Sequence, residues 1–169
     1  NIDDKYASRI IKKTKSKITT YGFGEKADIH LVSSRIRYQG MELIVSVYGN
    51  HYKIGAKITG IHNIYNIMAA IGACIANNIS IQMIIKSIEN IKNIPGRMEF
   101  IGSEKNKVFV DYAHTPDAYQ NILKLIGEIK NKKDKIITLF GCGGDRDRNK
   151  RPVMAKISEQ YSDRIIVTT

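Results

Sequence analysis

Val108-Phe-Val-Asp-Tyr-Ala-His-Thr-Pro-Asp-Ala118 predicts a buried strand that runs directly into a helix. The strand is expected first because residues 108–110 are β-branched or aromatic. Thr115 and Pro116 then form a helix start, with threonine as the cap and proline at the first helical position. Asp111 and His114 therefore lie between the end of a strand and the start of a helix. In an open parallel sheet ligands bind at this place, and the helix N-terminus favours anions such as phosphate.

Strands and helices alternate around this stretch. We expect strands at 98–101, 108–110, 136–140 and 164–168, and helices at 116–130 and 153–161. Such an alternation implies right-handed βαβ units on a parallel sheet.

The first half of the chain has a different pattern. Strand-like runs at 29–37, 41–48 and 52–59, separated by glycine-containing turns, predict a small antiparallel meander. The earlier segment 21–24 predicts a turn, and 60–76 predicts a buried helix. Asn93-Ile-Pro-Gly-Arg97 then breaks the pattern, so we expect one domain over residues 1–96 and another over 97–169.

Hydrogen-bonding side chains gather at the start of the helix at 60–76. Asn63 and Asn66 are three residues apart and share one helix face. Two interpretations stay open: Asn63 alone caps the helix, or the asparagines recognise a base or phosphate. Arg97, directly after Pro-Gly, is well placed as a fixed anion contact, although a single arginine is more often only a surface residue.

A glycine-rich loop, Gly141-Cys-Gly-Gly-Asp-Arg-Asp-Arg-Asn-Lys-Arg-Pro152, follows the strand expected at 136–140. Its glycines let a ligand approach the backbone closely, and its arginines offer donors for carboxylate or phosphate. Asp145 and Asp147 would orient these arginines or receive an amine. Cys142 has no histidine beside it in the loop and is therefore a poor candidate for a nucleophile. The mixture of charges predicts a zwitterionic ligand.

Composition narrows the possible partners. The net charge of +11 is compatible with nucleic-acid binding, but the lysines are scattered and the chain has no tryptophan and no aromatic–basic repeat. The two cysteines, far apart in the sequence, give no disulfide framework, which fits a reducing cytoplasm. No run suggests a membrane span, and no secretory signal opens the sequence. We therefore expect a cytoplasmic protein without nucleic-acid or membrane partners.

Four motifs together resemble the Mur ligases, most closely the type that adds diaminopimelate. They are Gly60…His62-Asn63…Asn66, Gly96-Arg97-Met98-Glu99, Asp111-Tyr-Ala-His-Thr-Pro-Asp117, and the glycine-rich loop with Lys150-Arg-Pro152. The similarity covers the whole chain. It implies an α/β fold: the end of a central ATPase domain with a small antiparallel sheet, then the start of a Rossmann-like C-terminal domain with a parallel sheet.

The resemblance implies an ATP-dependent amide ligase of peptidoglycan biosynthesis. ATP would phosphorylate the terminal carboxylate of UDP-MurNAc-L-Ala-D-Glu, and the amine of meso-diaminopimelate would attack the acyl phosphate. The implied ATP contacts are Asn63, Asn66, Arg97, Asp111 and His114. Arg146 matches the family position that holds diaminopimelate. The resemblance also implies a cytoplasmic monomer that uses Mg²⁺.

Other parts of the family pattern are expected outside the printed sequence. No G-x-x-x-x-G-K-[ST] phosphate loop is found in it. The carbamylated lysine and the magnesium ligands of the family are expected before Asn1, and its Asp-Asn-Pro-Arg motif after Thr169. The chain is thus expected to be an internal piece that has no catalytic residue or metal ligand of its own and is inactive alone. The alternatives are another Mur ligase or a folylpolyglutamate-synthase-like ligase, which would share the nucleotide residues but not Asp145-Arg-Asp147.

Overall fold

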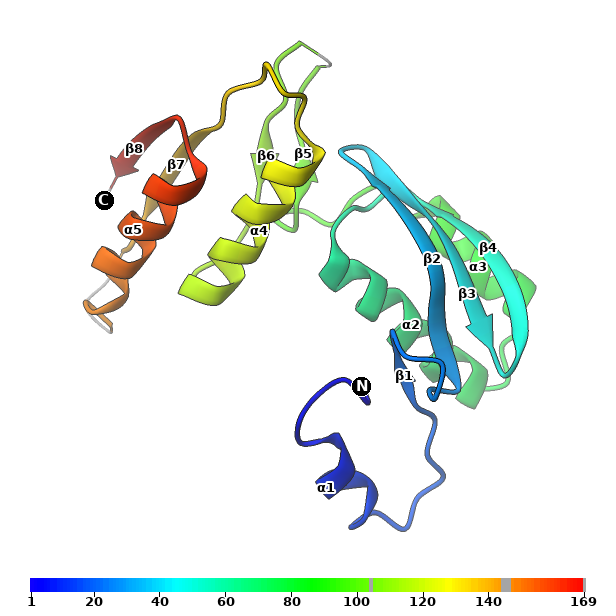
Figure 1. Ribbon diagram of the computed structural model, residues 1–169. Helices are drawn as coiled ribbons and strands as arrows, with labels where there is room; N and C mark the ends of the chain where they lie inside the picture. The colour runs from blue at the N-terminus through cyan, green and yellow to red at the C-terminus, as the bar shows by residue number, and fades with distance from the viewer. Residues whose placement is uncertain (104, 144–146, 169) are drawn as a thin grey trace. The chain divides into compact units, whose positions relative to one another are not determined.

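The computed structural model (Figure 1) describes residues 1–103, 105–143 and 147–168. The chain forms two compact units, Asn1–Ile94 and Pro95–Thr169. The division falls inside the segment 93–97, where the sequence pattern changes.

The first unit is a small sheet with helices. Its elements are α1 (Ala7–Ile11), β1 (Tyr21–Gly22), β2 (Ile29–Arg37), β3 (Gly40–Val47), β4 (Asn50–Ala56), α2 (Ile61–Ala76) and α3 (Ile81–Asn90). Strands β2, β3 and β4 form the expected antiparallel meander, and the buried helix is confirmed as α2. Strand β1 pairs with β2 in parallel, although its residues predict a turn.

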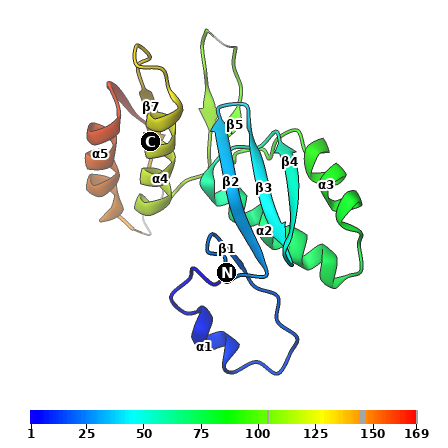
Figure 2. The same ribbon diagram turned by 45° about the vertical axis from the view of Figure 1, so that its right-hand side comes forward.

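Helix α2 packs on one face of the sheet, with α3 beside β4 (Figure 2), and the strands and both helices together form the core of this unit. Leu43, Val45 and Ile54 from the strands are at most 1% exposed. They meet Ile64 and Met68 of α2, which are 0% exposed. The apolar residues at every second position of the strands thus pack against the apolar face of the helix, as both sequence patterns predict.

A reciprocal hydrogen-bonded pair joins the segment before β1 to the start of β2. Thr20 donates through its backbone N and its hydroxyl to Asp28 Oδ2, both at 2.7 Å, and Thr20 Oγ1 accepts from Asp28 N at 2.9 Å. The hydroxyl and backbone hydrogen bonds from Thr20 lower the pKa of the Asp28 carboxyl. Because the folded-state pKa is depressed, the resulting stability is present at neutral pH and is lost as pH falls through that lowered value.

Asp28→Asn should therefore lower the melting temperature modestly at pH 7 in the full-length protein. The difference from the native protein should shrink as pH falls below the ordinary carboxyl value of 3.8. Thermal unfolding followed by circular dichroism from pH 7 to pH 3 would measure it. Glu25→Gln is the matched control because Glu25 is exposed, and it should have no such pH dependence. A difference for Asp28→Asn that does not change with pH would contradict this prediction.

The second unit alternates strands and helices. Its elements are β5 (Glu99–Phe100), β6 (Phe109–Val110), α4 (Pro116–Ile129), β7 (Ile137–Gly141), α5 (Lys150–Tyr161) and β8 (Arg164–Thr168). Strands β7 and β8 are parallel and α5 connects them, which confirms the predicted βαβ unit. Among the described residues β6 pairs with β5 in an antiparallel ladder and not with β7. The reason is local: β5 and β6 are close in the sequence, so β6 folds back on β5, and Ile101 N donates to Val108 O at 2.8 Å just beyond the ladder.

The core of the second unit lies where α4 and α5 pack together on β7. Tyr119 and Leu123 of α4 contact Phe140 of β7 and Met154 of α5. The Tyr119 hydroxyl is 2.8 Å from Ser158 Oγ in this core, and burial raises the pKa of Tyr119. The phenol therefore stays neutral and serves as a structural hydrogen-bonding group.

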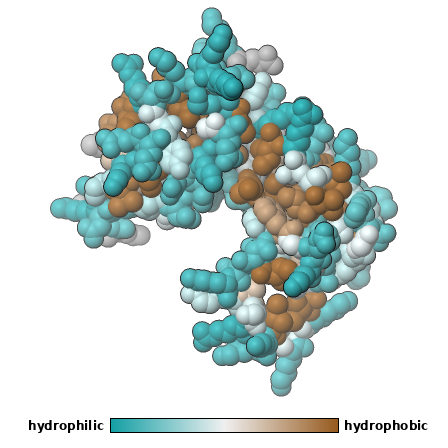
Figure 3. Space-filling model, viewed as in Figure 1, coloured by the Kyte–Doolittle hydropathy of each residue, from teal (hydrophilic) through white to brown (hydrophobic). Residues whose placement is uncertain are grey.

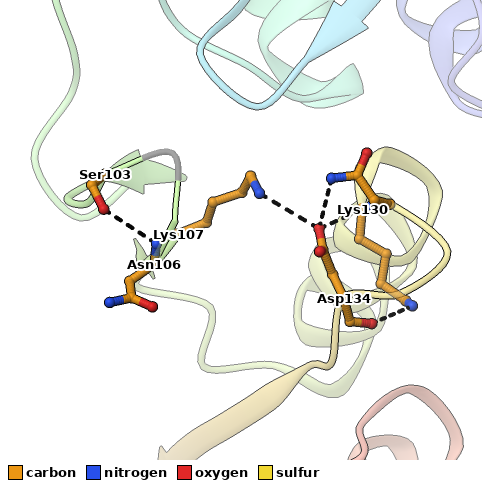
Figure 4. A network of polar contacts seen from close by, with 6 residues as sticks. Ser103, Asn106, Lys107, Lys130 and Asp134 are labelled. Atoms are coloured by element: carbon orange, nitrogen blue, oxygen red, sulfur yellow. Dashed lines mark hydrogen bonds and ion pairs between the residues drawn. The ribbon is translucent and has the colours of Figure 1, made fainter.

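A polar network attaches the β5–β6 connection to the loop before β7. Figure 4 shows Lys107 reaching toward Asp134, with their Nζ and Oδ2 atoms 3.5 Å apart. Asp134 also accepts from Asn131 N at 3.1 Å, and Lys130 Nζ donates to the Asp134 carbonyl at 2.7 Å. These contacts help to hold β5 and β6 in the second unit.

Hydrophilic residues cover much of the surface seen in Figure 3, with hydrophobic groups gathered in patches. Exposed apolar side chains are also found on the β7–β8 sheet, where Ile137 and Leu139 are 61% and 66% exposed. No helix in the described part of the chain is long and apolar enough to cross a membrane.

Candidate nucleotide and amino-acid site

Two short segments of the second unit, 96–99 and 111–115, are held together by backbone hydrogen bonds; we call them the clamp loops. Tyr112 N donates to Gly96 O at 2.8 Å. Asp111 Oδ2 accepts from Met98 N and Asp111 Oδ1 from Ala113 N, both at 2.7 Å. Each carboxylate oxygen of Asp111 thus satisfies a backbone donor. Asp111 therefore joins the two loops through Met98 N and braces its own loop through Ala113 N.

The backbone of the first clamp loop is in an unusual conformation. Met98 has φ 47° and Gly96 has φ 65°, so both lie in the left-handed region. For methionine this conformation is uncommon and costs free energy unless neighbouring contacts hold it. Met98 is 3% exposed, so its side chain anchors the turn. Arg97, between these two residues, consequently has its side chain at the surface.

The second clamp loop presents an aromatic ring and an imidazole. The Arg97 guanidinium carbon lies 5.7 Å from the centroid of the Tyr112 ring. The rings of Tyr112 and His114 are 5.2 Å apart with an interplanar angle of 55°. The structure thus brings Arg97, Asp111 and His114 together, and it places Tyr112 between Arg97 and His114, which the sequence pattern did not indicate. The available signal was an aromatic residue between two candidate ligand-binding residues.

Helix α4 begins directly after the second clamp loop. Thr115 Oγ1 accepts from Ala118 N at 3.4 Å, and Pro116 takes the first helical position. The predicted cap is confirmed. The helix N-terminus therefore lies next in sequence to His114, where its dipole favours a phosphate.

The start of α2, in the first unit, holds Asn63 and Asn66. Asn63 is 2% exposed; its Nδ2 donates to Thr59 O at 2.8 Å and its Oδ1 accepts from Asn66 Nδ2 at 3.1 Å. Asn66 is exposed. Asn63 does not cap the helix, because the cap position is Gly60 and no side chain caps it. Recognition of a base or phosphate by the two asparagines stays a prediction. Thr59 also donates through Oγ1 to Arg37 O at 2.7 Å, which fixes the start of the helix to the end of β2.

The glycine-rich loop is only partly described. Arg146 and Asp145 lie outside the described residues. Cys142 Sγ is 3.6 Å from Met154 Sδ, so this thiol packs against α5. Lys150 Nζ donates to His114 O at 3.2 Å and so ties the start of α5 to the second clamp loop. Nothing in the sequence pattern alone indicated this contact.

A pocket of about 550 Å³ opens beside the described part of the glycine-rich loop. Its lining includes Cys142, Gly143, Arg151 and Pro152. Most of its lining is apolar, so the pocket by itself does not indicate a charged amino acid.

The described residues fit a nucleotide better than a metal ion. A guanidinium, an imidazole and a helix N-terminus lie together in the second unit, and all of them suit phosphate or ribose. No group of three or more histidine, cysteine, aspartate or glutamate side chains in the described part of the chain could hold a metal ion.

Comparison with known protein families matches each of the two units to a domain of one family. Residues 1–74 match the Mur ligase middle domain, and residues 96–169 match the Mur ligase glutamate ligase domain. UDP-N-acetylmuramoyl-L-alanyl-D-glutamate–2,6-diaminopimelate ligases from Clostridium tetani and Aquifex aeolicus are 40% and 39% identical to this chain. Both alignments cover 100% of this chain, and 35% and 34% of those proteins. The chain thus spans about a third of the length of these curated relatives.

Solved structures agree with this family. A UDP-N-acetylmuramoyl-L-alanyl-D-glutamate–2,6-diaminopimelate ligase superposes with a TM-score of 0.71 and 29% identity, over 100% of this chain and 36% of that one. MurF from Acinetobacter baumannii gives a TM-score of 0.79 at 19% identity, over 97% and 36% of the two chains. Folylpolyglutamate synthetase from Lactobacillus casei gives 0.72 at 14% identity, over 94% and 38%. The last two similarities show the fold alone. With both of its units matched to domains of one family, the chain belongs to the Mur ligases.

Proposed function

We propose that this chain is part of an ATP-dependent amide ligase that adds meso-diaminopimelate to UDP-MurNAc-L-Ala-D-Glu in peptidoglycan biosynthesis. The observation that carries the proposal is the pair of clamp loops, which present Arg97 and His114 beside the N-terminus of α4. The names of the relatives from Clostridium tetani and Aquifex aeolicus support the choice of substrate. We propose a cytoplasmic, monomeric enzyme.

Each residue proposed to bind ATP would have a different role. Asn66 would hydrogen-bond the adenine, with Asn63 holding it in place through the 3.1 Å contact. Arg97 and His114 would contact ribose and phosphate, while Asp111 keeps their loops in position through its two backbone hydrogen bonds. ATP supplies the phosphoryl group that activates the substrate carboxylate. These residues bind and orient it.

The glycine-rich loop would receive the incoming amino acid. Arg146 is proposed to bind a carboxylate of diaminopimelate, because an arginine fork pairs with a carboxylate through two hydrogen bonds. The pocket beside Cys142 and Gly143 lies next to this loop in the sequence. Mg²⁺ is proposed to bind to other parts of the longer protein.

Purified full-length protein supplied with ATP, UDP-MurNAc-L-Ala-D-Glu and meso-diaminopimelate should form ADP, phosphate and the tripeptide product in equal amounts. Omission of any one substrate should stop product formation, and L-lysine should replace diaminopimelate poorly. Mass spectrometry of the product and a coupled ADP assay would measure both. The isolated 169-residue chain should be inactive under the same conditions. Extension of a folate by glutamate, without tripeptide formation, would favour a folylpolyglutamate-synthase-like enzyme and overturn the proposal.

A further inference from the structure

We infer that Tyr112 is a positioning residue of the nucleotide site: its ring holds the Arg97 guanidinium in the orientation that binds ATP. The inference rests on the proposed function, since it assumes that Arg97 contacts the nucleotide. It adds a residue to which neither the sequence motifs nor the relatives' names assign a role.

The exposure of Tyr112 argues against a role in the core. Its side chain is on the surface, and the residue is 65% exposed. Its backbone, by contrast, is fixed, because Tyr112 N donates to Gly96 O at 2.8 Å and the flanking Ala113 N donates to Asp111 at 2.7 Å. The clamp loops therefore hold an exposed ring in a defined place.

Two of the three candidate ligand-binding side chains of the clamp loops, Arg97 and His114, lie near this ring. The Arg97 guanidinium carbon is 5.7 Å from the ring centroid, within the range of cation–π contacts. The His114 ring is 5.2 Å away, and His114 Nδ1 lies 3.2 Å from Tyr112 O. A guanidinium is weakly hydrated and stacks well on aromatic faces. The ring thus limits the conformations of a long, exposed side chain without occupying its hydrogen-bond donors.

Restricting Arg97 before ATP arrives lowers the entropy lost on binding. Because the ring acts through its face, the phenolic hydroxyl is not needed. Phenylalanine at this position should therefore work as well as tyrosine, whereas alanine should not. The effect should appear in ATP binding and not in the amino-acid site or in folding.

In the full-length protein, Tyr112→Ala should raise the KM for ATP about two- to fivefold, the range expected for one exposed cation–π contact. The KM for diaminopimelate, kcat and the melting temperature should stay unchanged, and Tyr112→Phe should keep the native KM for ATP. Tyr6→Ala is the matched control, because Lys5 Nζ lies 5.0 Å from the ring of this exposed tyrosine, which is outside the site. It should leave every one of these values unchanged.

A double-mutant cycle with Arg97→Ala distinguishes a wrong role for Tyr112 from a wrong assignment of Arg97 to the nucleotide. If Tyr112 acts through Arg97, the two changes should be non-additive, so that Tyr112→Ala adds little once Arg97 is gone. Additive effects, an equal loss in Tyr112→Phe, or a lowered melting temperature would overturn the positioning role. If Arg97→Ala itself leaves the KM for ATP unchanged, the nucleotide assignment in the proposed function is wrong instead.

Discussion

Asp111→Ala should lower the free energy of unfolding of the second unit by about 3 kcal/mol, since a hydrogen bond to a charged group contributes about 1.5–3 kcal/mol. Two such bonds are lost, from Met98 N and Ala113 N, each at 2.7 Å. Met98 would then keep its left-handed φ of 47° with fewer contacts to hold it. Arg97 and His114 would lose their common support. The KM for ATP should consequently rise by roughly 30-fold or more, given about 2 kcal/mol lost in binding.

Chemical denaturation and steady-state kinetics of the full-length protein would measure both effects. Asp111→Asn keeps one carbonyl oxygen as an acceptor and should lie between alanine and the native residue in both measurements. Asp117→Ala is the matched control, because Asp117 lies in the first turn of α4 and contacts the side chain of Asn121. A higher KM for ATP with unchanged stability would mean that Asp111 touches the nucleotide without bracing the loops.

The strands and helices set by local chemistry were predictable from the sequence. Thr115 caps α4 as expected, and β8 has the expected bounds, Arg164–Thr168. The meander of β2, β3 and β4 was also predictable, because alternating apolar residues and glycine turns specify it within a few residues. The cap and the meander depend on partners that lie near them in the sequence, whereas β8 pairs with the more distant β7 and was predictable from its own apolar run.

Elements that depend on distant partners were not predictable in this way. Strand β1 has two residues and pairs with β2, supported by the contacts between Thr20 and Asp28. Asp3 is another example: its carboxylate accepts from Phe23 N at 2.7 Å and from the Tyr65 hydroxyl at 2.9 Å. Burial, together with this contact to Asp3, raises the pKa of Tyr65 to about 12. A sequence pattern contains no signal for such pairs.

In the candidate site, too, some features were predictable from the sequence and contacts between distant residues were not. The sequence indicated which residue types lie at the ends of strands and the starts of helices. It did not show that Asn63 is buried behind Asn66, because that depends on Thr59 accepting a hydrogen bond from the side chain. Nor did it show that Lys150 contacts His114 O, since the two residues belong to different loops. A motif can thus be found in the sequence alone, whereas the contacts of each residue in it are known only from the folded structure.

Arg146→Ala should raise the KM for diaminopimelate roughly 100-fold in the full-length enzyme, which corresponds to about 2.7 kcal/mol for a lost charge-assisted pair. Arg146 lies outside the described residues, and in the sequence it stands between Asp145 and Asp147 of the glycine-rich loop, two carboxylates that would orient its guanidinium. Arg146→Lys keeps the charge but loses the bidentate fork, and a rise of about tenfold is expected. Arg148→Lys, in the same loop, is the matched control and should have little effect.

Comparing the change in KM for ATP with the change in KM for diaminopimelate shows whether Arg146 binds the amino acid. If it binds the amino acid, the KM for ATP and the melting temperature should remain close to the native values in both variants. Steady-state kinetics with each substrate varied in turn, and thermal unfolding of the same preparations, would measure this. Equal rises in both KM values, or a large loss of stability, would mean that Arg146 only braces the loop. In that case recognition of the amino acid would have to come from other residues, such as those around the pocket lined by Cys142, Gly143 and Arg151.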